Sequence, residues 1–311
     1  MNESVQTSQT QDQQFMPVWL RLFPFFLSAF LFLSVFFTLF APLPLLSLAI
    51  RTNIKKVALA LAVNTAIVLF LGGPSSACFF VTFVGGVVLA LPYCLFTRNF
   101  SVNKSVAVTV VSIIFSVGVI FSLYCMSQQI APMVWLEQQV QVVFDQVLAV
   151  SAGDSTKLFG GLPPEVAKKN LIQEFPSTLF IFSLIMVWVN FLMLFKFSPL
   201  VFKSKLNLDF TFLKTWRAPD YLVWPTILSG ATLLIDMGTL SLVGLNVFKV
   251  LLSIYAIQGL SVLSYFLDHW KVTGMLRSAG YLIVVFLVTP FLLALGFFDF
   301  WFNFRSKVKS T

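Results

Sequence analysis

The sequence predicts an all-α membrane protein, a polytopic bundle of about eight transmembrane helices with an external amphipathic helical loop. Of its 311 residues 58% are hydrophobic and 10% charged, with 37 phenylalanines, which is more apolar side chains than a soluble core of this length can bury. Apolar runs of about 20 residues recur along the chain, and at about 1.5 Å per helical residue each matches a hydrocarbon layer of about 30 Å. These runs lack the alternation of polar and apolar residues that marks the strands of a membrane barrel.

A polar segment precedes the predicted bundle and a basic one follows it. Residues 1–20 are expected to be a disordered tail, because the first 15 contain no lysine or arginine and the next apolar segment is too long for a signal-peptide core. Residues 21–305 are expected to form a single transmembrane helical domain, with an external loop at 128–175, and residues 306–311 a basic C-terminal tail.

Eight apolar segments make up the predicted bundle. They are Pro24–Ile50, Thr52–Leu71, Ser76–Phe96, Ser105–Ser127, Pro176–Phe195, Pro219–Leu240, Val247–Asp268 and Leu276–Phe298. The first is long and contains APLP at residues 41–44, whose two prolines remove backbone donors and should break or kink a helix there. It therefore either crosses once at a tilt or returns as a short hairpin.

Lysine and arginine residues predict the orientation of the bundle. Twelve of them fall in loops on one side: Arg51, Lys55, Lys56, Arg98, Lys104, Lys196, Lys203, Lys205, Lys214, Arg217, Lys271 and Arg277. That side is expected to be cytoplasmic, and the opposite loop, 128–175, carries five acidic residues against three lysines. The C-terminal Arg305, Lys307 and Lys309 fall on the opposite side. Either the last segment does not cross simply, or the tail departs from the rule.

The external loop contains two predicted helices. Between Pro132 and Val150 apolar residues recur at helical spacing, with Glu, Gln and Asp between them, the pattern of an amphipathic helix. After a break rich in glycine and proline, a short helix is expected from Pro164 to Phe175. The pair is either a folded connector, a membrane-surface element or the cap of a cavity.

Signatures of enzymes are mostly missing. The chain has a single histidine, His269, and no metalloprotease histidine pair, nucleophile elbow or phosphate-binding loop. Cys78, Cys94 and Cys125 lie in apolar runs without metal-ligand spacing and are expected to be packing residues. We therefore expect no catalytic residue, metal, cofactor or nucleic-acid partner. Active transport would need an ion gradient or an energising subunit.

The second apolar segment combines one polar amide with a ridge of small residues. Asn64 lies in the middle of the segment, and Ala58, Ala62 and Ala66 recur at a spacing of four. Such a ridge lets another helix approach closely inside a membrane. It serves either packing within this chain or docking of a partner subunit.

The seventh segment carries a polar face. Tyr255, Gln258, Val262 and Tyr265 recur at spacings of three and four. That face either lines a pocket with aromatic walls, or it packs in the core with Gln258 in an interhelical hydrogen bond.

Asp236 and Lys249 flank the stretch GTLSLVGLN at residues 238–246, whose Gly238, Gly244 and Asn246 predict a turn. Both charges would then lie near the external end of a helical hairpin. They are expected to form either a structural ion pair or part of a ligand or ion site.

The end of the chain, LGFFDFWFNFRSKVKS, mixes aromatic residues with Asp299 and Arg305. A contact between these two requires the backbone to depart from a plain helix, because six residues place them about 120° apart.

Several stretches resemble the YybS-like family of uncharacterised bacterial multi-pass membrane proteins. They are WRAPDYLVWP at 216–225, Asn246 with IQGLSVLSYFLD at 257–268, LGFFDFWFNFR at 295–305, APLPLLSLAIR at 41–51 and LGGPSSACFFVTFVGG at 71–86. That family is distantly similar to the S components of energy-coupling-factor transporters, which bind a small solute and dock on an ATP-driven module. The resemblance implies a bacterial inner-membrane protein related to transport.

Two functions follow from these features. The first is solute binding or transport, with an external-side pocket formed by Asp236, Asn246, Lys249, Tyr255 and Gln258 and with an energising subunit as partner. The second is a non-transporting scaffold or assembly partner in the cell envelope. A packed, cavity-free environment around Gln258 would favour the scaffold.

Overall fold

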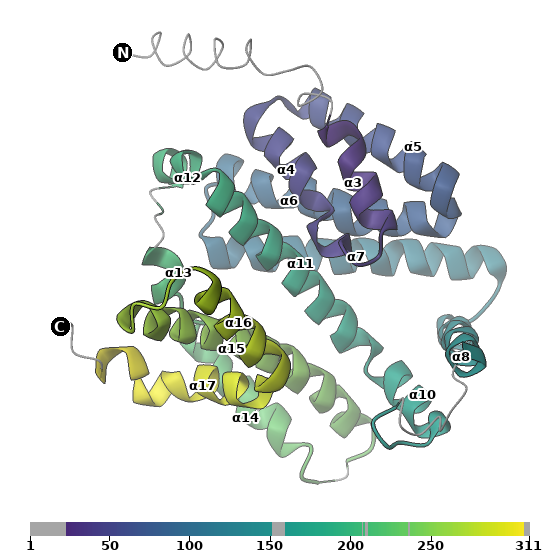
Figure 1. The fold of residues 1–311 in the computed structure, drawn as a ribbon. Helices are drawn as coiled ribbons and strands as arrows, with labels where there is room; N and C mark the ends of the chain where they lie inside the picture. Colours follow the sequence, from purple (N-terminus) through teal and green to yellow (C-terminus); the bar gives the residue numbers. More distant parts are fainter. Residues whose placement is uncertain (1–22, 151–158, 207, 209–210, 236, 308–311) are drawn as a thin grey trace. The chain divides into compact units, whose positions relative to one another are not determined.

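The computed structural model describes residues 23–150, 159–206, 208, 211–235 and 237–307. Its contacts divide the chain into two compact units, the first made of Met1–Tyr124 and Phe182–Asn207, the second of Cys125–Ile181 and Leu208–Thr311. The elements of each are labelled in Figure 1. Two helices, α7 and α11, contribute to both units, and each unit is considered by itself.

The first unit begins with a short helical hairpin. Helix α3 (Pro24–Leu33) is followed by the 3₁₀ turn η1 (Thr38–Phe40) and by α4 (Pro42–Arg51), which packs against α3. The break falls at residues 34–37, where Val35 has a φ of 61°. The prediction of a break at APLP is therefore wrong in position: Pro42 is the first residue of α4, where a missing N–H costs nothing.

The next stretch, Ile54–Thr97, folds back on itself. It contains α5 (Ile54–Phe79), the π-helix η2 (Phe80–Gly85), α6 (Gly86–Pro92) and the π-helix η3 (Tyr93–Thr97). Inside α5, Gly73 has a non-helical φ of 80° and is followed by Pro74. A Cβ on Gly85 would lie 3.5 Å from Leu61, whereas 24 residues of straight helix span about 36 Å. The predicted segments Thr52–Leu71 and Ser76–Phe96 are thus two arms of a hairpin.

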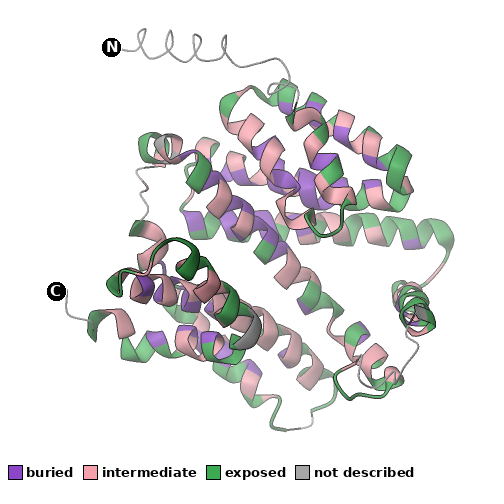
Figure 2. Cartoon of the chain, viewed as in Figure 1, coloured by how far each residue is buried: buried purple, intermediate pink, exposed green. Residues whose placement is uncertain are grey.

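The rest of the first unit is the larger part of α7 (Val102–Gln128), the part of α11 (Phe175–Phe197) from Phe182 onward, and α12 (Pro199–Leu206). Buried residues gather on α6 and on this part of α11, shown in purple in Figure 2. Gly86 lets α7 approach, because a Cβ there would lie 2.7 Å from Ile113. Cys94 is buried as expected, but Cys78 is exposed, so packing does not explain it.

The second unit begins with the two helices predicted for the external loop, α8 (Pro132–Val150) and α10 (Pro164–Gln173). They pack on each other through Val140, Phe144 and Ile172. The apolar face predicted for the amphipathic helix is thus at least partly covered within the chain.

The remainder of the second unit contains α13 (Thr211–Thr215), η4 (Asp220–Leu222), α14 (Val223–Ala231), α15 (Thr239–His269), α16 (Gly274–Leu287), α17 (Thr289–Phe302) and η5 (Phe304–Lys307). Gly238, with a φ of 58°, immediately precedes α15. The turn predicted across residues 238–246 is therefore wrong for Gly244 and Asn246, which lie inside α15. Gly244 instead permits close packing, because a Cβ there would lie 1.9 Å from Thr232 Oγ1.

Helices α15 and α17 lie side by side and cross at two glycines (Figure 1). A Cβ on Gly296 would lie 1.9 Å from the Tyr255 carbonyl oxygen, and one on Gly259 would lie 2.2 Å from that of Leu292. Only glycine allows two helix backbones to come this close. The crossing therefore fixes which residues of α15 face α17.

Helices α16 and α17 are bent by 93° relative to one another. Near the start of the pair, Arg277 contacts Asp268, and just after its end Arg305 lies 3.4 Å from Ser261. These two positions on α15 are seven residues, or about 10 Å, apart. The pair therefore begins and ends near the same end of α15, and such a bend is typical of a broken span or a re-entrant loop. Arg305 thereby joins Lys214 and Arg217 instead of lying opposite them.

Among the described residues, four helical stretches are long and apolar enough to cross a membrane: Ile54–Thr97, α7, α11 and α15. The bent pair α16 and α17 raises this number to five if it forms one span. The all-helical, several-span architecture is as predicted, but about eight transmembrane helices are not confirmed. The first segment is split into two ten-residue helices, and Pro219–Leu240 contains η4, the nine-residue α14 and only the first two residues of α15.

Candidate functional site

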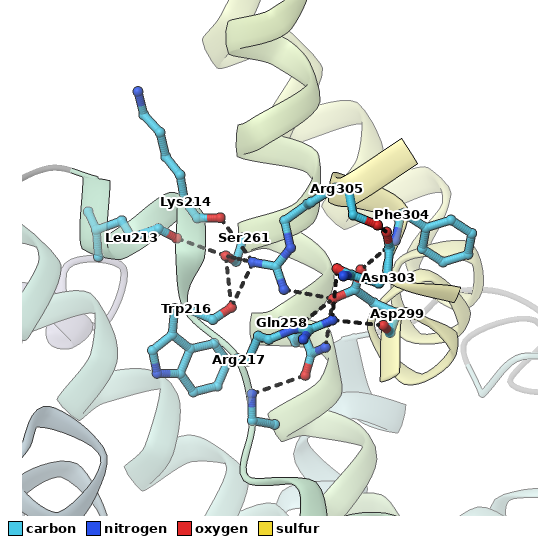
Figure 3. Close-up of polar contacts among 12 residues, drawn as sticks. Leu213, Lys214, Trp216, Arg217, Gln258, Ser261, Asp299, Asn303, Phe304 and Arg305 are labelled. Carbon is cyan, nitrogen blue, oxygen red and sulfur yellow. Dashed lines mark hydrogen bonds and ion pairs between the residues drawn. The ribbon is translucent and has the colours of Figure 1, made fainter. Parts of the chain in front are cut away.

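Asp299 is the centre of a buried ionic cluster in the second unit (Figure 3). Its side chain is fully buried, and its Oδ2 accepts hydrogen bonds from Gln258 Nε2 at 3.0 Å and from Arg305 Nη2 at 2.7 Å. Its Oδ1 accepts from the backbone N–H of Phe304 at 3.0 Å. The carboxylate is thus held by an amide, a guanidinium and a backbone donor at once.

The end of α17 explains how Arg305 reaches a carboxylate six residues earlier. The helix ends at Phe302, and Asn303 adopts the left-handed conformation with φ 40° and ψ 59°, which asparagine tolerates better than most residues. The chain then turns into η5 and brings Arg305 back over Asp299. The expected departure from a plain helix is therefore present, and with it the contact.

Arg217 is a second cation in the cluster. Its Nε lies 3.6 Å from Asp299 Oδ2, and its Nη2 donates to Asn303 Oδ1 at 3.0 Å. The Arg217 side chain is 42% exposed, whereas that of Arg305 is 9% exposed. Arg305 is therefore the inner counter-ion of Asp299, and Arg217 is the outer one.

One face of α15 carries the polar partners of the cluster. Gln258, Ser261, Ser264 and Asp268, here called the polar stripe, follow at spacings of three, three and four, which places them on one side of a helix. Ser261 Oγ donates to the Leu213 carbonyl oxygen at 2.8 Å.

Asp268, at the end of the stripe, pairs with Lys214 and Arg277. Arg277 also donates to Ser264 Oγ at 2.9 Å. The segment around Lys214 and the start of α16 are thus both anchored on the polar stripe.

A second polar group lies nearer the start of α15. Asn246 Nδ2 donates to the Gln173 carbonyl oxygen at 2.9 Å, and Asn246 Oδ1 accepts from the Ser177 N–H at 3.0 Å. Lys249 Nζ lies 2.5 Å from Glu174 Oε2. Asn246 and Lys249 therefore hold the junction between α10 and α11. The expected partner of Lys249, Asp236, lies outside the described residues.

The two polar groups are too close along α15 to lie at opposite membrane surfaces. Lys249 and Gln258 are nine residues apart, or about 13 Å, against a hydrocarbon layer of about 30 Å. If α15 crosses the bilayer, one of the two groups lies within it. Buried ion pairs at such depth are costly and mark functional positions, and the Asp299 cluster is the more buried of the two groups.

The predicted pocket on the Tyr255 and Gln258 face is filled by α17. Tyr255 is 1% exposed and packs edge-on against Phe297, with ring centroids 5.1 Å apart. Gln258 Oε1 accepts from the Ala218 N–H at 3.0 Å, while its amide group donates to Asp299. The alternative expected for this face, an interhelical hydrogen bond, is the one that the structure contains.

A shallow, open cleft of about 550 Å³ lies instead at the turn before α15. Its lining residues are Gln173, Leu233, Leu234, Ile235, Gly238, Ser241, Leu242 and Leu245. Of the predicted ligand-binding residues, none that the structure describes is among them. The cleft does involve the predicted hairpin and the end of the external loop.

In the first unit, Asn64 and the alanine ridge lie on opposite sides of α5. Asn64 is buried, accepts from the Ala29 N–H at 2.8 Å and donates to the Ala60 carbonyl oxygen at 2.8 Å. All three alanines of the ridge, Ala58, Ala62 and Ala66, are exposed. Packing within this unit therefore uses the Asn64 face and leaves the ridge uncovered.

Sequence reasoning missed the joint role of Asp299, Arg217 and Arg305. The contact between Asp299 and Arg305 was considered, but Arg217 lies 82 residues before Asp299, which hides it from any local pattern. The available signal was a single carboxylate inside the apolar run GFFDFWF. In the described part of the chain, no group of His, Cys, Asp or Glu side chains is suited to hold a metal ion.

Comparison with known proteins gives a family but no function. Neither a curated protein nor a solved structure matches the chain. A family model described as "Predicted membrane protein (DUF2232)" matches residues 19–300. This match does not confirm the resemblance to the YybS-like family or to S components of energy-coupling-factor transporters. Because the match covers most of the sequence, the chain belongs to the predicted membrane protein family DUF2232.

Proposed function

We propose that this protein is a non-catalytic docking subunit of the bacterial cytoplasmic membrane, which binds another membrane protein through Ala58, Ala62 and Ala66. The observation that carries the proposal is the exposure of all three alanines on a predicted membrane helix. Small residues at a spacing of four allow close backbone approach and are favoured at helix interfaces in membranes.

The packing of the last helices also supports a scaffold over a transporter. Gln258 is bonded to Ala218 and Asp299, and Tyr255 is buried against α17. A solute pocket on this face would require these contacts to open. A docking subunit needs them to stay closed.

Replacing the ridge alanines tests the docking role. We expect Ala62→Leu to abolish co-purification of a partner in native membrane discs, because the added side chain holds the two helices apart. Leu71→Phe is the matched control, since Leu71 is 58% exposed on the same helix but lies about 180° away from the ridge. Native mass spectrometry then identifies the bound mass as a second copy or another protein. Equal assemblies for wild type and Ala62→Leu would contradict the proposal.

Solute binding is a second candidate, favoured by the cleft of about 550 Å³ at the turn before α15. Its lining is mostly leucine and isoleucine with Gln173 and Ser241, which suits a small amphipathic molecule. In this case the docked protein would be an energising subunit.

Filling the cleft separates the two candidates. Leu242→Trp should remove any ligand-induced rise in melting temperature, because Leu242 lines the cleft. Leu240→Trp is the control, since Leu240 is 50% exposed and is not a lining residue. If no solute in a screen of metabolites stabilises the wild type, or if both variants respond as the wild type does, solute binding in the cleft is wrong.

A further inference from the structure

The net charge of the chain is concentrated on the first unit. Nine basic residues against two acidic ones give that unit a net charge of +7, whereas eleven basic and ten acidic residues leave the second unit at +1. The two acidic residues of the first unit, Glu3 and Asp12, lie outside its described residues. Such a charge difference between two parts of one chain is typical of a protein of which one part binds nucleic acid or a membrane surface.

In the described part of the first unit, the basic side chains are exposed and have no acidic partner. None of them forms an ion pair with a described residue. In the second unit, by contrast, Lys214, Arg277 and Arg305 each contact a carboxylate. The exposed basic residues of the first unit, here called the basic end, are Arg51, Lys55, Lys56, Arg98, Lys104, Lys196, Lys203 and Lys205. Their charge must therefore be balanced from outside the described part of the unit.

The basic end lies where the membrane helices of this unit end. Its first three members lie within three residues of the start of the candidate span Ile54–Thr97, and Arg98 directly follows that span. Lys104 is the third residue of α7, and the remaining three lysines lie between the last turn of α11 and the end of α12. A span ends where the hydrocarbon layer gives way to the lipid headgroups. These side chains therefore lie at the level of the headgroups.

These span ends belong to one end of the unit. In the hairpin Ile54–Thr97, Leu61 and Gly85 approach each other, and they lie seven residues from its start and twelve from its end, or about 10 and 18 Å along a helix. The two ends of the hairpin therefore lie on the same side of this approach. Helix α7 begins five residues after the hairpin, and α12 packs against η3, with Lys205 Nζ 5.2 Å from the centre of the Phe96 ring.

Three cations of the basic end are held over aromatic rings between residues 93 and 100. The pairs are Arg98 over Tyr93, Lys104 over Phe100 and Lys205 over Phe96, at 5.5, 4.0 and 5.2 Å from the ring centres. Arg98 Nε also donates to Tyr93 Oη at 2.9 Å. A cation above a ring keeps its charge, and all three side chains remain exposed. The rings thus gather positive charge around η3 without neutralising it.

We infer that the basic end is a docking surface for the anionic phospholipids of the leaflet that it faces. Anionic headgroups attract basic side chains near the membrane surface, and these eight belong to the ends of three spans instead of to one pocket. They therefore contact several headgroups at once, and no single phosphate has to bridge them. Headgroups surround every span end, whereas an acidic protein would cover only some of them. This role goes beyond docking on the alanine ridge.

Native mass spectrometry of the purified full chain, titrated with phosphatidylglycerol and with phosphatidylcholine, tests the inference. We expect the wild type to bind several phosphatidylglycerol molecules, each more tightly than phosphatidylcholine. Lys104→Gln combined with Lys205→Gln should lower this preference at least about five-fold, because one basic residue near an anionic surface contributes about 1 kcal/mol. Lys196→Gln combined with Lys203→Gln should have the same effect from another part of the basic end.

A matched pair of lysines in the second unit serves as the control. Lys271 and Lys307 are exposed, and Lys307 lies over the Phe302 ring as Lys104 lies over that of Phe100. Lys271→Gln combined with Lys307→Gln removes the same charge from a unit whose net charge is only +1, so the lipid preference should stay close to that of the wild type. Because every substituted side chain is exposed, all variants should keep the wild-type melting temperature.

Three outcomes overturn the inference. The first is a wild type without preference for phosphatidylglycerol. The second is an unchanged preference in the test pairs, or an equal loss in test and control pairs. The third is tighter binding of a polyglutamate peptide than of phosphatidylglycerol by the wild type in phosphatidylcholine discs, which would assign the basic end to an acidic protein. None of the substituted lysines lies on α5, so a failure here is distinguishable from failure of the docking role of the alanine ridge.

Discussion

The two units of the chain are held together by different chemistry. In the first unit, buried amides of Asn64 and Asn190 bond to backbone groups of α3 and η1, at 2.8 Å to Ala29 N and 2.7 Å to Leu39 O. Three of its basic side chains, Arg98, Lys104 and Lys205, lie over aromatic rings. In the second unit, Asp299 and Asp268 are each held by two cations.

This difference follows from composition, because the described residues of the first unit contain no aspartate or glutamate. Hydrogen bonds from a side-chain amide to backbone groups join helices at a low energetic cost, because no net charge is buried. A buried carboxylate with two cations must overcome desolvation of every ion and is often no more stable than apolar packing. Among the described residues, all ion pairs lie in the second unit, so the loss of one charge should destabilise that unit more than any polar substitution destabilises the first.

The sharpest way to test this comparison is to remove the carboxylate of Asp299. Asp299→Asn should destabilise the second unit by about 3–5 kcal/mol, because Arg305 is left buried without a counter-ion. The double variant with Arg305→Met should lose less than the sum of the two single changes. Reversible unfolding in mixed detergent measures the free energy of unfolding of all three variants. Additive losses of that free energy would show that Asp299 and Arg305 do not interact.

Replacement of a glycine by alanine should also have a different effect on stability in each unit. Gly296→Ala should cost about 3 kcal/mol, because the added Cβ would meet backbone atoms of Tyr255 and Gly259 that cannot move aside. Gly85→Ala in the first unit should stay within about 1 kcal/mol of wild type, since its nearest neighbour is the Leu61 side chain at 3.5 Å. Melting temperatures in detergent compare the two, and equal losses would mean that α15 and α17 are not in backbone contact.

Asn64 should matter less than Asp299. Asn64→Leu is expected to cost about 1 kcal/mol, the usual size of an interhelical hydrogen bond in a membrane, because the Ala29 N–H and the Pro24 carbonyl oxygen lose a partner. Thr65→Val nearby serves as a control for changing a polar residue on α5, because the half-buried Thr65 hydroxyl donates only to the Leu61 carbonyl oxygen of its own helix. If Asn64→Leu lowered the free energy of unfolding as much as Asp299→Asn does, helix contacts made by side-chain amides and by ion pairs would not differ in strength.

The smallest effect is expected at Lys249. Its pairing with Glu174 leaves the two side chains 36% and 30% exposed, so Lys249→Met should cost less than about 1 kcal/mol. In double-mutant cycles, Lys249→Met should couple to Glu174→Gln and act additively with Asp236→Asn. Coupling to Asp236 in place of Glu174 would restore the hairpin ion pair expected from the sequence.

Local sequence patterns predicted the presence of helices well, but they predicted poorly where a helix is interrupted. The amphipathic helix at Pro132–Val150 was predicted at its observed bounds, because its periodicity is complete within one segment. The first apolar segment and Pro219–Leu240 were predicted as single helices, but breaks at Val35 and after Ala231 divide them. Proline and glycine mark where a break is allowed, but the neighbouring helices decide whether it occurs.

The candidate site was predicted in part. The sequence singled out Gln258, Asn246 and Lys249 because a polar residue in an apolar run needs a partner. The partners themselves, Asp299, Gln173 and Glu174, lie 41, 73 and 75 residues away along the chain, beyond the reach of any helical periodicity.

By itself, the amino-acid sequence determined that this is a membrane protein built of apolar helices, because composition and run length depend on no tertiary contact. It also determined that Asp299 and Arg305 meet only if the helix ends between them. The tertiary structure alone decided that Asn303 ends the helix there, that Gln258 and Arg217 join the same carboxylate, and that Lys249 pairs with Glu174. Ion pairing depends on atoms within a few ångströms, and the folding of α10, α15 and α17 brings those atoms together.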